Sequence, residues 1–403
     1  MPTINQRQKK ILSTVCLYHA LNDASVAIIP LLIPIFKVQF DLSYTQIGIV
    51  TGSALAINLV AQLLIGRRSE YWNPRWALSF GIFLMAIGLF LLSTSFDFLS
   101  LFAFMIVARL AASFFHPIGV GWISKTFRKS RLDWAMGVQS GFADIGACIA
   151  MASTLFFASV WFWQLPLYLF SVLCFFGVIV GVLATRGVVE DNIKKENNRK
   201  TLKHFFGEDV EFLSRVKLLI PAFIISGAGW NVTITYLPLL FDEKTALSLS
   251  VIGLLMAVWV GMGSIVSFYF GRITDTFGRW KVMVGGYLLF GIACFIVTLT
   301  ATLVALLAIM VLLGISIFLT YPALFSYVTE LSAGKQRRDF AMVFTLQLGG
   351  GTILAFVSGW LADLLGIQMP FVLMGTLSLS LFVLLVCNHR WLKNKIRDVN
   401  AAA

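Results

Sequence analysis

Three polar side chains lie close together within the first long apolar stretch of the chain, at His19, Asn22 and Asp23. An α-helix turns by about 100° per residue, so Asn22 and Asp23 fall on either side of His19 and all three share one helical face. A charged carboxylate near the middle of a bilayer costs at least about 2.5 kcal/mol. A chain keeps such a group where it faces water, a partner or a passing solute, so this face is the first candidate for a functional site.

A second polar face is expected in the fourth apolar stretch, where Arg109, Ser113 and His116 are spaced i, i+4 and i+7. On a continuous helix these three side chains stack within a narrow arc. Arg109 with the two histidines is a reasonable anion site, and a structural ion pair of Arg109 with Asp23 or Asp144 is the alternative. Directly after His116 comes a proline, which is expected to kink the helix.

The fifth apolar stretch carries Gly137, Gly141, Asp144 and Cys148 on one helical face. The two glycines fit close packing against a neighbouring helix. Asp144 is either a second proton carrier or a buried partner for Arg109 or for a helix end, and the sequence favours neither. All ionisable groups expected in mid-membrane belong to the first half of the chain: His19, Asp23, Arg109, His116 and Asp144.

The second half of the chain offers uncharged polar and aromatic groups instead. This asymmetry indicates proton coupling in the first half and solute contacts that include hydrogen bonds and aromatic rings from the second half. Helix packing is the competing interpretation for each of these hydroxyl and aromatic residues. The expected solute-contacting residues of both halves are Asn22, Ser113, Gln139, Trp230, Asn231, Thr235, Tyr236, Thr320, Tyr321 and Gln347.

The composition places these faces in an all-α membrane protein. Of the 403 residues, 59% are hydrophobic and 12% charged, whereas a soluble domain carries about a quarter charged residues. Apolar runs of about 20 residues suit transmembrane helices, and a membrane barrel shows shorter alternating segments. Twelve spans are expected, at 11–36, 44–66, 76–95, 98–124, 134–158, 163–185, 217–241, 249–271, 280–299, 302–328, 340–365 and 370–388.

The formal net charge of +12 reports membrane topology and not a nucleic-acid partner. Apart from Lys37, Lys244 and Arg109, the Lys and Arg residues gather at one side of the twelve spans. The positive-inside rule then puts both termini and the central loop in the cytoplasm. The five cysteines are scattered through the spans without a CxxC pair, so no disulfide framework, metal site or cofactor is expected.

An internal repeat divides the chain into two halves. The segment 42–48 returns at 247–253, and Asp133-Trp134-Ala135-Met136 returns as Asp339-Phe340-Ala341-Met342, an offset of about 205 residues that is typical of transporters built from parallel repeats. We expect two pseudo-symmetric six-helix bundles at 1–185 and 217–403, joined by a polar linker at 186–216. The end of that linker, near 205–213, has the pattern of a short amphipathic helix on the inner membrane surface.

The loop after the eighth span identifies a family resemblance. Its pattern GxxxDxxGRxK, from Gly271 to Lys281, resembles the signature of the major facilitator superfamily between helices 8 and 9, and the first copy at 66–75 keeps the glycine and the acid. The resemblance covers essentially the whole chain and implies the major facilitator fold. It also implies that helices 1, 4, 7 and 10 line a central cavity and that Arg109 responds to proton movement or holds an anionic group. The residues of the two motif copies are Gly66, Glu70, Gly271, Asp275, Gly278 and Arg279.

Within that superfamily the chain resembles the fosmidomycin-resistance group of exporters, through His19-x-x-Asn22-Asp23, Phe115-His116-Pro117 and the run 70–76. The resemblance implies an exporter, with one departure. Exporters of the superfamily usually carry a glycine-proline pair late in helix 5, and those positions read Ala150-Met151 here.

The sequence therefore predicts a proton-coupled exporter of a small organic compound, a monomer in the inner membrane of a bacterium or archaeon. Asp23 would exchange the proton, His19 and His116 would relay it or bind solute, and Arg109 would couple protonation to conformation. The rival interpretations are proton-coupled uptake of an anionic metabolite or siderophore, and a non-transporting membrane sensor or assembly partner. No nucleophile or metal constellation surrounds the polar residues, so an enzyme is not expected.

Overall fold

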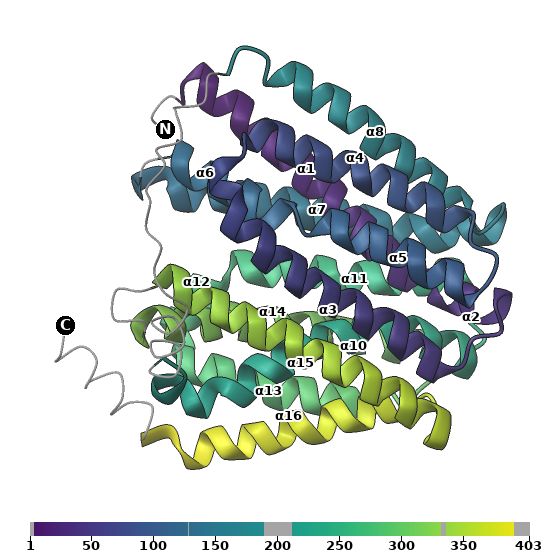
Figure 1. Ribbon diagram of the computed structural model, residues 1–403. Helices are drawn as coiled ribbons and strands as arrows, with labels where there is room; N and C mark the ends of the chain where they lie inside the picture. The colour runs from purple at the N-terminus through teal and green to yellow at the C-terminus, as the bar shows by residue number, and fades with distance from the viewer. Residues whose placement is uncertain (1–3, 128, 189–211, 332–335, 391–403) are drawn as a thin grey trace. The chain divides into compact units, whose positions relative to one another are not determined.

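The computed structural model describes residues 4–127, 129–188, 212–331 and 336–390, without the side chains at 70, 129, 130, 133, 336–338 and 341. Within these ranges all regular structure is helical (Figure 1). In the described part of the chain, twelve helical segments are long and apolar enough to cross a membrane, and each overlaps one of the twelve expected spans. The predicted all-α membrane fold is confirmed.

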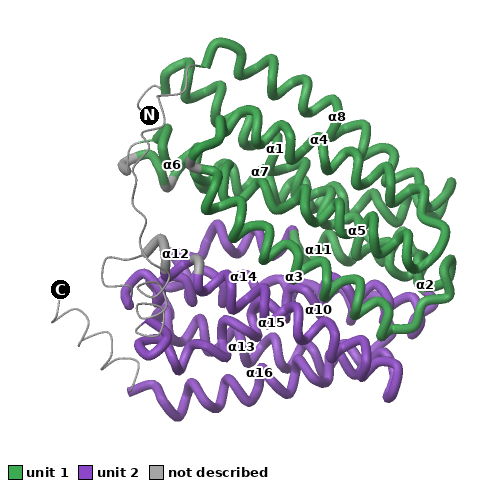
Figure 2. The backbone as a smooth tube through the Cα atoms, viewed as in Figure 1, with its two compact units in different colours: residues 1–195, 247–260 green, residues 196–246, 261–403 purple. Residues whose placement is uncertain are grey.

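The described chain divides into two compact units (Figure 2), residues 1–195 with 247–260 and residues 196–246 with 261–403. The sequence-based division at 1–185, 186–216 and 217–403 differs in where residues 247–260 belong, and it stays a prediction. The first unit contains α1 (Gln6–Leu31), α2 (Ile33–Gln39), α3 (Tyr44–Arg68), η1 (Ser69–Tyr71), α4 (Pro74–Ser93), α5 (Phe98–Ala112), η2 (His116–Val120), α6 (Gly121–Thr126), α7 (Lys129–Val160), α8 (Leu165–Ala184) and the beginning of α11 (Leu249–Phe268).

The second unit contains the end of α11 together with η3 (Lys217–Leu219), α10 (Ile220–Lys244), α12 (Phe270–Phe277), α13 (Arg279–Ile296), α14 (Leu303–Leu331), α15 (Gln336–Leu365) and α16 (Met369–Cys387). In the first unit α1 packs mainly against α7, and α4 against α8. In the second unit the corresponding main contacts are those of α10 with α15 and of α13 with α14 and α16.

Local sequence signals set several helix ends. The Asn5 side chain accepts a hydrogen bond from the Gln8 backbone N–H at 2.8 Å, and the Gln8 side chain accepts one from the Asn5 N–H at 3.2 Å. Ser43 and Gln46 form the same capping box at the start of α3. Such caps satisfy backbone donors that a helix start leaves without partners. They explain why α1 begins at Gln6, five residues before the expected start.

Close packing between α1 and α7 depends on Gly146. A Cβ atom at this position would lie 2.4 Å from the backbone oxygen of Ala20, so any side chain here would clash with the backbone of α1. A Cβ atom at Gly137 or Gly141 would meet nothing within 4 Å. The expectation that these two glycines provide the close helix contact was wrong, and the contact lies further along α7.

A similar close glycine contact occurs within each of the two units. A Cβ atom at Gly81 would lie 2.6 Å from Cβ of Phe114, and one at Gly286 would lie 2.4 Å from Cγ2 of Thr320. These pairs are separated in the sequence by the same offset of about 205 residues that relates the two halves. The duplication is therefore visible in helix packing as well as in sequence motifs.

The fourth span is interrupted in its middle. Its first helix, α5, ends at Ala112, and the chain continues through a turn into η2, a π-helical segment that begins at His116. Pro117 has no backbone N–H and cannot complete the regular α-helical pattern, which accounts for a break at this point. The helix is interrupted where the kink was predicted, and His116 therefore does not lie on the same continuous helix as Arg109 and its C-terminal neighbour Ser113.

Part of the sequence-based predictions falls on residues that are not described. These are the linker from 189 to 211, which includes most of the expected amphipathic helix near 205–213, and the side chain of Glu70.

Candidate functional site

The polar residues of α1 form a hydrogen-bonded group. Nε2 of His19 lies 3.4 Å from Oδ2 of Asp23, one helical turn away. The side-chain N–H of Asn22 donates to Oδ1 of Asp23 at 2.8 Å. His19 and Asn22 are buried, whereas the Asp23 side chain is 32% exposed. The sequence pattern thus placed these three side chains together correctly.

The second nitrogen of the His19 ring fixes its tautomer. Nδ1 lies 3.1 Å from the backbone oxygen of Gln139 on α7. A carbonyl oxygen only accepts hydrogen bonds, so Nδ1 carries a hydrogen. Nε2 then faces the Asp23 carboxylate, and two lone pairs at this distance repel unless a proton lies between them. The pair therefore holds one proton, either as imidazolium with carboxylate or as neutral imidazole with carboxylic acid.

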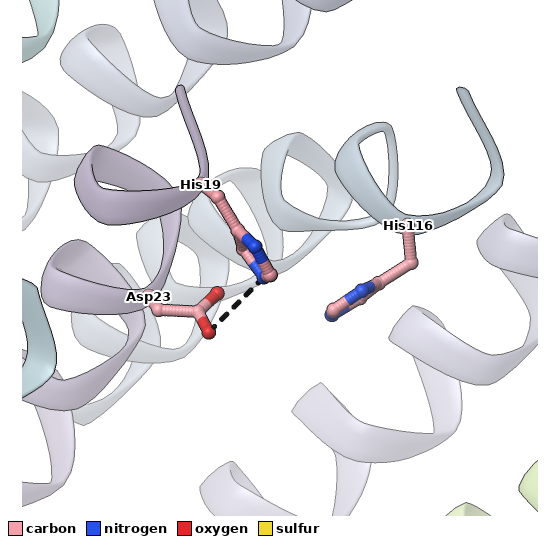
Figure 3. A group of neighbouring side chains, drawn as sticks. All are labelled: His19, Asp23 and His116. Carbon is pink, nitrogen blue, oxygen red and sulfur yellow. Dashed lines mark ion pairs between the residues drawn. The ribbon is translucent and has the colours of Figure 1, made fainter. Parts of the chain in front are cut away.

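His116 lies beside the His19–Asp23 pair (Figure 3), and Phe115 covers another side of the His19 ring. The Phe115 ring stacks on the imidazole with centroids 4.1 Å apart, and the His116 ring meets it edge-on at 5.5 Å. Phe115 is buried, but His116 is exposed. The Phe115 ring therefore covers one side of the His19–Asp23 pair, and the exposed His116 imidazole lies on another side.

The three ionisable residues are also a candidate metal set. One ligand atom from each of His19, Asp23 and His116 lies within 4.8 Å of the others. Two imidazoles and a carboxylate are ligands that zinc accepts, but bonds of about 2.0–2.1 Å in a tetrahedral site bring ligand atoms to about 3.3 Å of one another. His19 and Asp23 meet this spacing, and His116 would have to move closer. The observed geometry suits proton exchange better than metal binding.

The polar residues of the fourth span point elsewhere. The Ser113 hydroxyl lies 3.0 Å from Oδ1 of Asn58 on α3 and 2.8 Å from the backbone oxygen of Arg109. Neither contact involves the His19 group, so of the three polar residues Arg109, Ser113 and His116 the described contacts bring His116 alone to that group. Among the described residues the Arg109 guanidinium has no ion pair, and its Nε has no hydrogen-bond partner.

Two expected residues of α7 have different surroundings. Gln139 is buried, and it contacts His19 through its backbone oxygen, while its side-chain N–H lies 2.9 Å from the Ser140 hydroxyl. Asp144, which lies further along α7, is half-buried and is not a member of the group around His19.

In the second unit the expected solute-contacting residues separate into two classes. Three of them are buried and hydrogen-bonded within the helix packing: the Tyr236 hydroxyl donates to the Ala355 oxygen, Thr320 bonds to its own helix, and the Gln347 N–H donates to Ser226. Thr235 is buried too. Trp230, Asn231 and Tyr321 are half-buried. The last three are the better candidates for solute contact.

The loop motif of the second unit contains an ion pair that the sequence did not predict. Arg279, the first residue of α13, pairs with Glu330 near the end of α14, and their side chains are 45% and 34% exposed. The Trp280 ring stacks on His389 with centroids 4.8 Å apart. Gly278 has a φ of +83°, a conformation that suits glycine, which explains its place in the motif.

Comparison with known proteins supports this architecture. A family model described as Major Facilitator Superfamily matches residues 15–333 and 219–398. The uncharacterized MFS-type transporter MJ1560 of Methanocaldococcus jannaschii is 21% identical over 326 residues, or 80% of this chain and 83% of that protein. The fosmidomycin resistance protein of Escherichia coli is 27% identical over 107 residues, which cover 27% of this chain and 26% of that protein.

Solved structures show the same fold at low sequence identity. A peptide transporter POT solved in complex with sulfate has a TM-score of 0.78 and 15% identity, with 98% of this chain and 99% of that chain covered. A bacterial homologue of the human lysosomal transporter Spinster, in an inward-facing conformation, has a TM-score of 0.75 and 14% identity, with 98% of both chains covered. These likenesses establish the fold alone.

Proposed function

The chain belongs to the major facilitator superfamily and is a secondary transporter, and on that premise we propose that it exports a small organic compound in exchange for protons. The observation that carries the proposal is the His19–Asp23 pair, which holds one proton at the edge of a buried group. A coupled transporter needs a site that gains and loses a proton as the protein changes conformation. His116, accessible and in contact with His19, is placed to pass the proton on.

The proposal gives each of these polar residues a role. Asp23 exchanges the proton, His19 and His116 relay it, and Arg109 couples protonation to conformation or holds an anionic group of the solute. Asp144 is either a second proton carrier or a structural partner. Residues of both halves contact the small solute. The protein acts as a monomer, and its two halves rock so that the solute site opens to one side of the membrane and then to the other.

Export is favoured by the segment of 107 residues over which this chain is similar to the protein named for fosmidomycin resistance. Uptake of an anionic metabolite or siderophore with protons is the second candidate, favoured by Ala150-Met151 in place of the glycine-proline pair of exporters. The excess of Lys and Arg on one side of the spans supports an orientation in the inner membrane with both termini in the cytoplasm.

Proton movement in sealed vesicles tests the proposal and separates the two directions. We expect purified protein in liposomes, preloaded with a labelled solute and a pH-sensitive dye, to release the solute faster when the outside is made acidic. The vesicle interior should acidify in step, because each solute leaving is exchanged for protons entering. In symport, outside acid instead drives solute inward. Release that is indifferent to the gradient and leaves the internal pH unchanged contradicts proton coupling.

A further inference from the structure

A charged group in the middle of the fourth span has no ion-pair partner among the described residues. Arg109 lies well inside the span Phe98–Thr126, and no described residue forms an ion pair with its guanidinium. Its Nε is buried without a hydrogen-bond acceptor. An unpaired charge at this depth is costly. A chain that retains one is expected to use it, and the natural counterpart of a guanidinium is an anion.

Three polar residues, Asn58 and Gln62 on α3 and Ser113 at the end of α5, form a hydrogen-bonded row, called here the polar row. Oδ1 of Asn58 accepts a hydrogen bond from Nε2 of Gln62 at 2.8 Å. At 3.0 Å it also shares the single hydrogen of the Ser113 hydroxyl with the Arg109 backbone oxygen. The amide oxygen of Asn58 is therefore occupied, and its N–H groups have no partner among the described residues. Sequence reasoning missed Asn58 and Gln62, two uncharged polar residues one helical turn apart in α3.

The row and the arginine lie on the same side of the fourth span. Arg109 and Ser113 are spaced i, i+4, and such residues are neighbours on one helical face. Ser113 faces Asn58, so Arg109 faces α3 as well. This side offers a positive charge and amide donors, and no carboxylate of the described residues forms an ion pair with it. A solute that carries only donors or a positive charge would not be stabilised here.

We propose that Arg109 and Asn58 form a subsite of the first unit that binds an organic anion, through the oxygens of a carboxylate or phosphoryl group. The guanidinium donates parallel N–H groups to two such oxygens, and the Asn58 amide donates an N–H to one of them. Ser113 and Gln62 are positioning residues that hold the Asn58 amide with its donors outward. The identification of this anion as the transported solute rests on the proposed function, but its binding does not.

Thermal unfolding of the purified protein tests the subsite without any transport measurement. The probes are two matched pairs, benzoate with benzamide and phenylphosphonate with its neutral dimethyl ester. We expect at least one of the two anions to raise the unfolding temperature by about 2 °C at ten times its dissociation constant, because ligands of the folded state stabilise it. The uncharged analogues should leave the temperature unchanged. The anion that acts shows whether a carboxylate or a phosphoryl group is preferred.

Variants distinguish a ligand-binding arginine from a structural one. Arg109→Gln should raise the unfolding temperature of the ligand-free protein, since it removes an unpaired charge, and should abolish the anion-induced shift. Arg109→Lys should retain part of the shift, and Asn58→Leu should reduce it. The matched control is Arg75, whose Nη2 donates to the Val182 oxygen at 2.6 Å. Arg75→Gln should lower the ligand-free unfolding temperature and keep the anion shift.

Several results would overturn the subsite: no shift from either anion, equal shifts from the neutral analogues, or a full shift in Arg109→Gln. A failure of proton coupling is recognised separately, because loss of gradient-driven solute release in vesicles leaves the anion shift in place.

Discussion

Replacing Asp23 with asparagine is expected to abolish proton-coupled transport while leaving the protein folded. Asparagine has nearly the shape of aspartate and can still contact His19 and Asn22, but it cannot take up the proton that the His19–Asp23 pair holds. Losing about 1.4 kcal/mol of coupling already slows a process by about tenfold, so a decrease of at least that size is expected. Gradient-driven release of labelled solute from liposomes measures the effect.

The control for Asp23→Asn is a carboxylate outside the membrane. Asp97 caps α5, and its hydrogen bonds with Ser100 hold the pKa of its carboxyl below the usual value. Asp97→Asn keeps an acceptor for the helix start, so transport should stay close to that of the unmodified protein. Solute exchange without net proton movement should persist in Asp23→Asn. Full gradient-driven transport in that variant would rule out Asp23 as the coupling residue.

The membrane spans could be predicted well because apolar run length is a physical requirement of the bilayer. The second span, expected at 44–66, is observed as α3 at Tyr44–Arg68. The start of α1 was missed although its signal is local, since Asn5 and Gln8 form a capping box in front of the apolar run. The break after Ala112 was predictable only as a kink at Pro117, because the turn and the π-helical segment depend on tertiary packing.

The candidate site was predictable only where its contacts are local. His19 and Asp23 are one helical turn apart, so spacing alone brings them together. The partner of the other His19 nitrogen is a backbone oxygen of Gln139, 120 residues away. Every residue type has such an oxygen, and sequence carries no sign of which one will be used. Ser113 was predicted to face the same group, but it contacts Asn58 on α3, and the break that separates it from His116 is a feature of tertiary packing.

Helical spacing alone does not show which glycines bring two helices into contact. Gly137 and Gly141 share a face with Asp144, yet a side chain at either would meet open space. The close contact with α1 lies instead at Gly146, which approaches the backbone oxygen of Ala20. Ala20 belongs to a helix more than a hundred residues earlier, so the local sequence around Gly146 does not indicate this contact. Distances of this kind are set by packing of whole helices and not by local pattern.

The second large effect is expected from Gly146→Ala, compared with Gly141→Ala on the same helix. The added Cβ at Gly146 would lie 2.4 Å from the Ala20 oxygen, a backbone atom that cannot rotate away. Alanine there should lower the free energy of unfolding by about 1–3 kcal/mol, the usual cost of overpacking. Gly141→Ala adds its methyl where nothing lies within 4 Å, so higher helix propensity should stabilise the protein by up to about 1 kcal/mol. Thermal unfolding in detergent measures both.

The same pair of variants links packing to the site. Ala20 follows His19 directly, so pushing α1 away from α7 at Gly146 also lengthens the 3.1 Å contact between Nδ1 of His19 and the Gln139 oxygen. That contact fixes which nitrogen of His19 faces Asp23. Without it, the His19–Asp23 pair no longer holds its proton at a defined position. Gly146→Ala should therefore reduce gradient-driven transport in the fraction that remains folded, and Gly141→Ala should not. Equal effects of the two substitutions on stability and transport would show that the α1–α7 contact does not position the proton site.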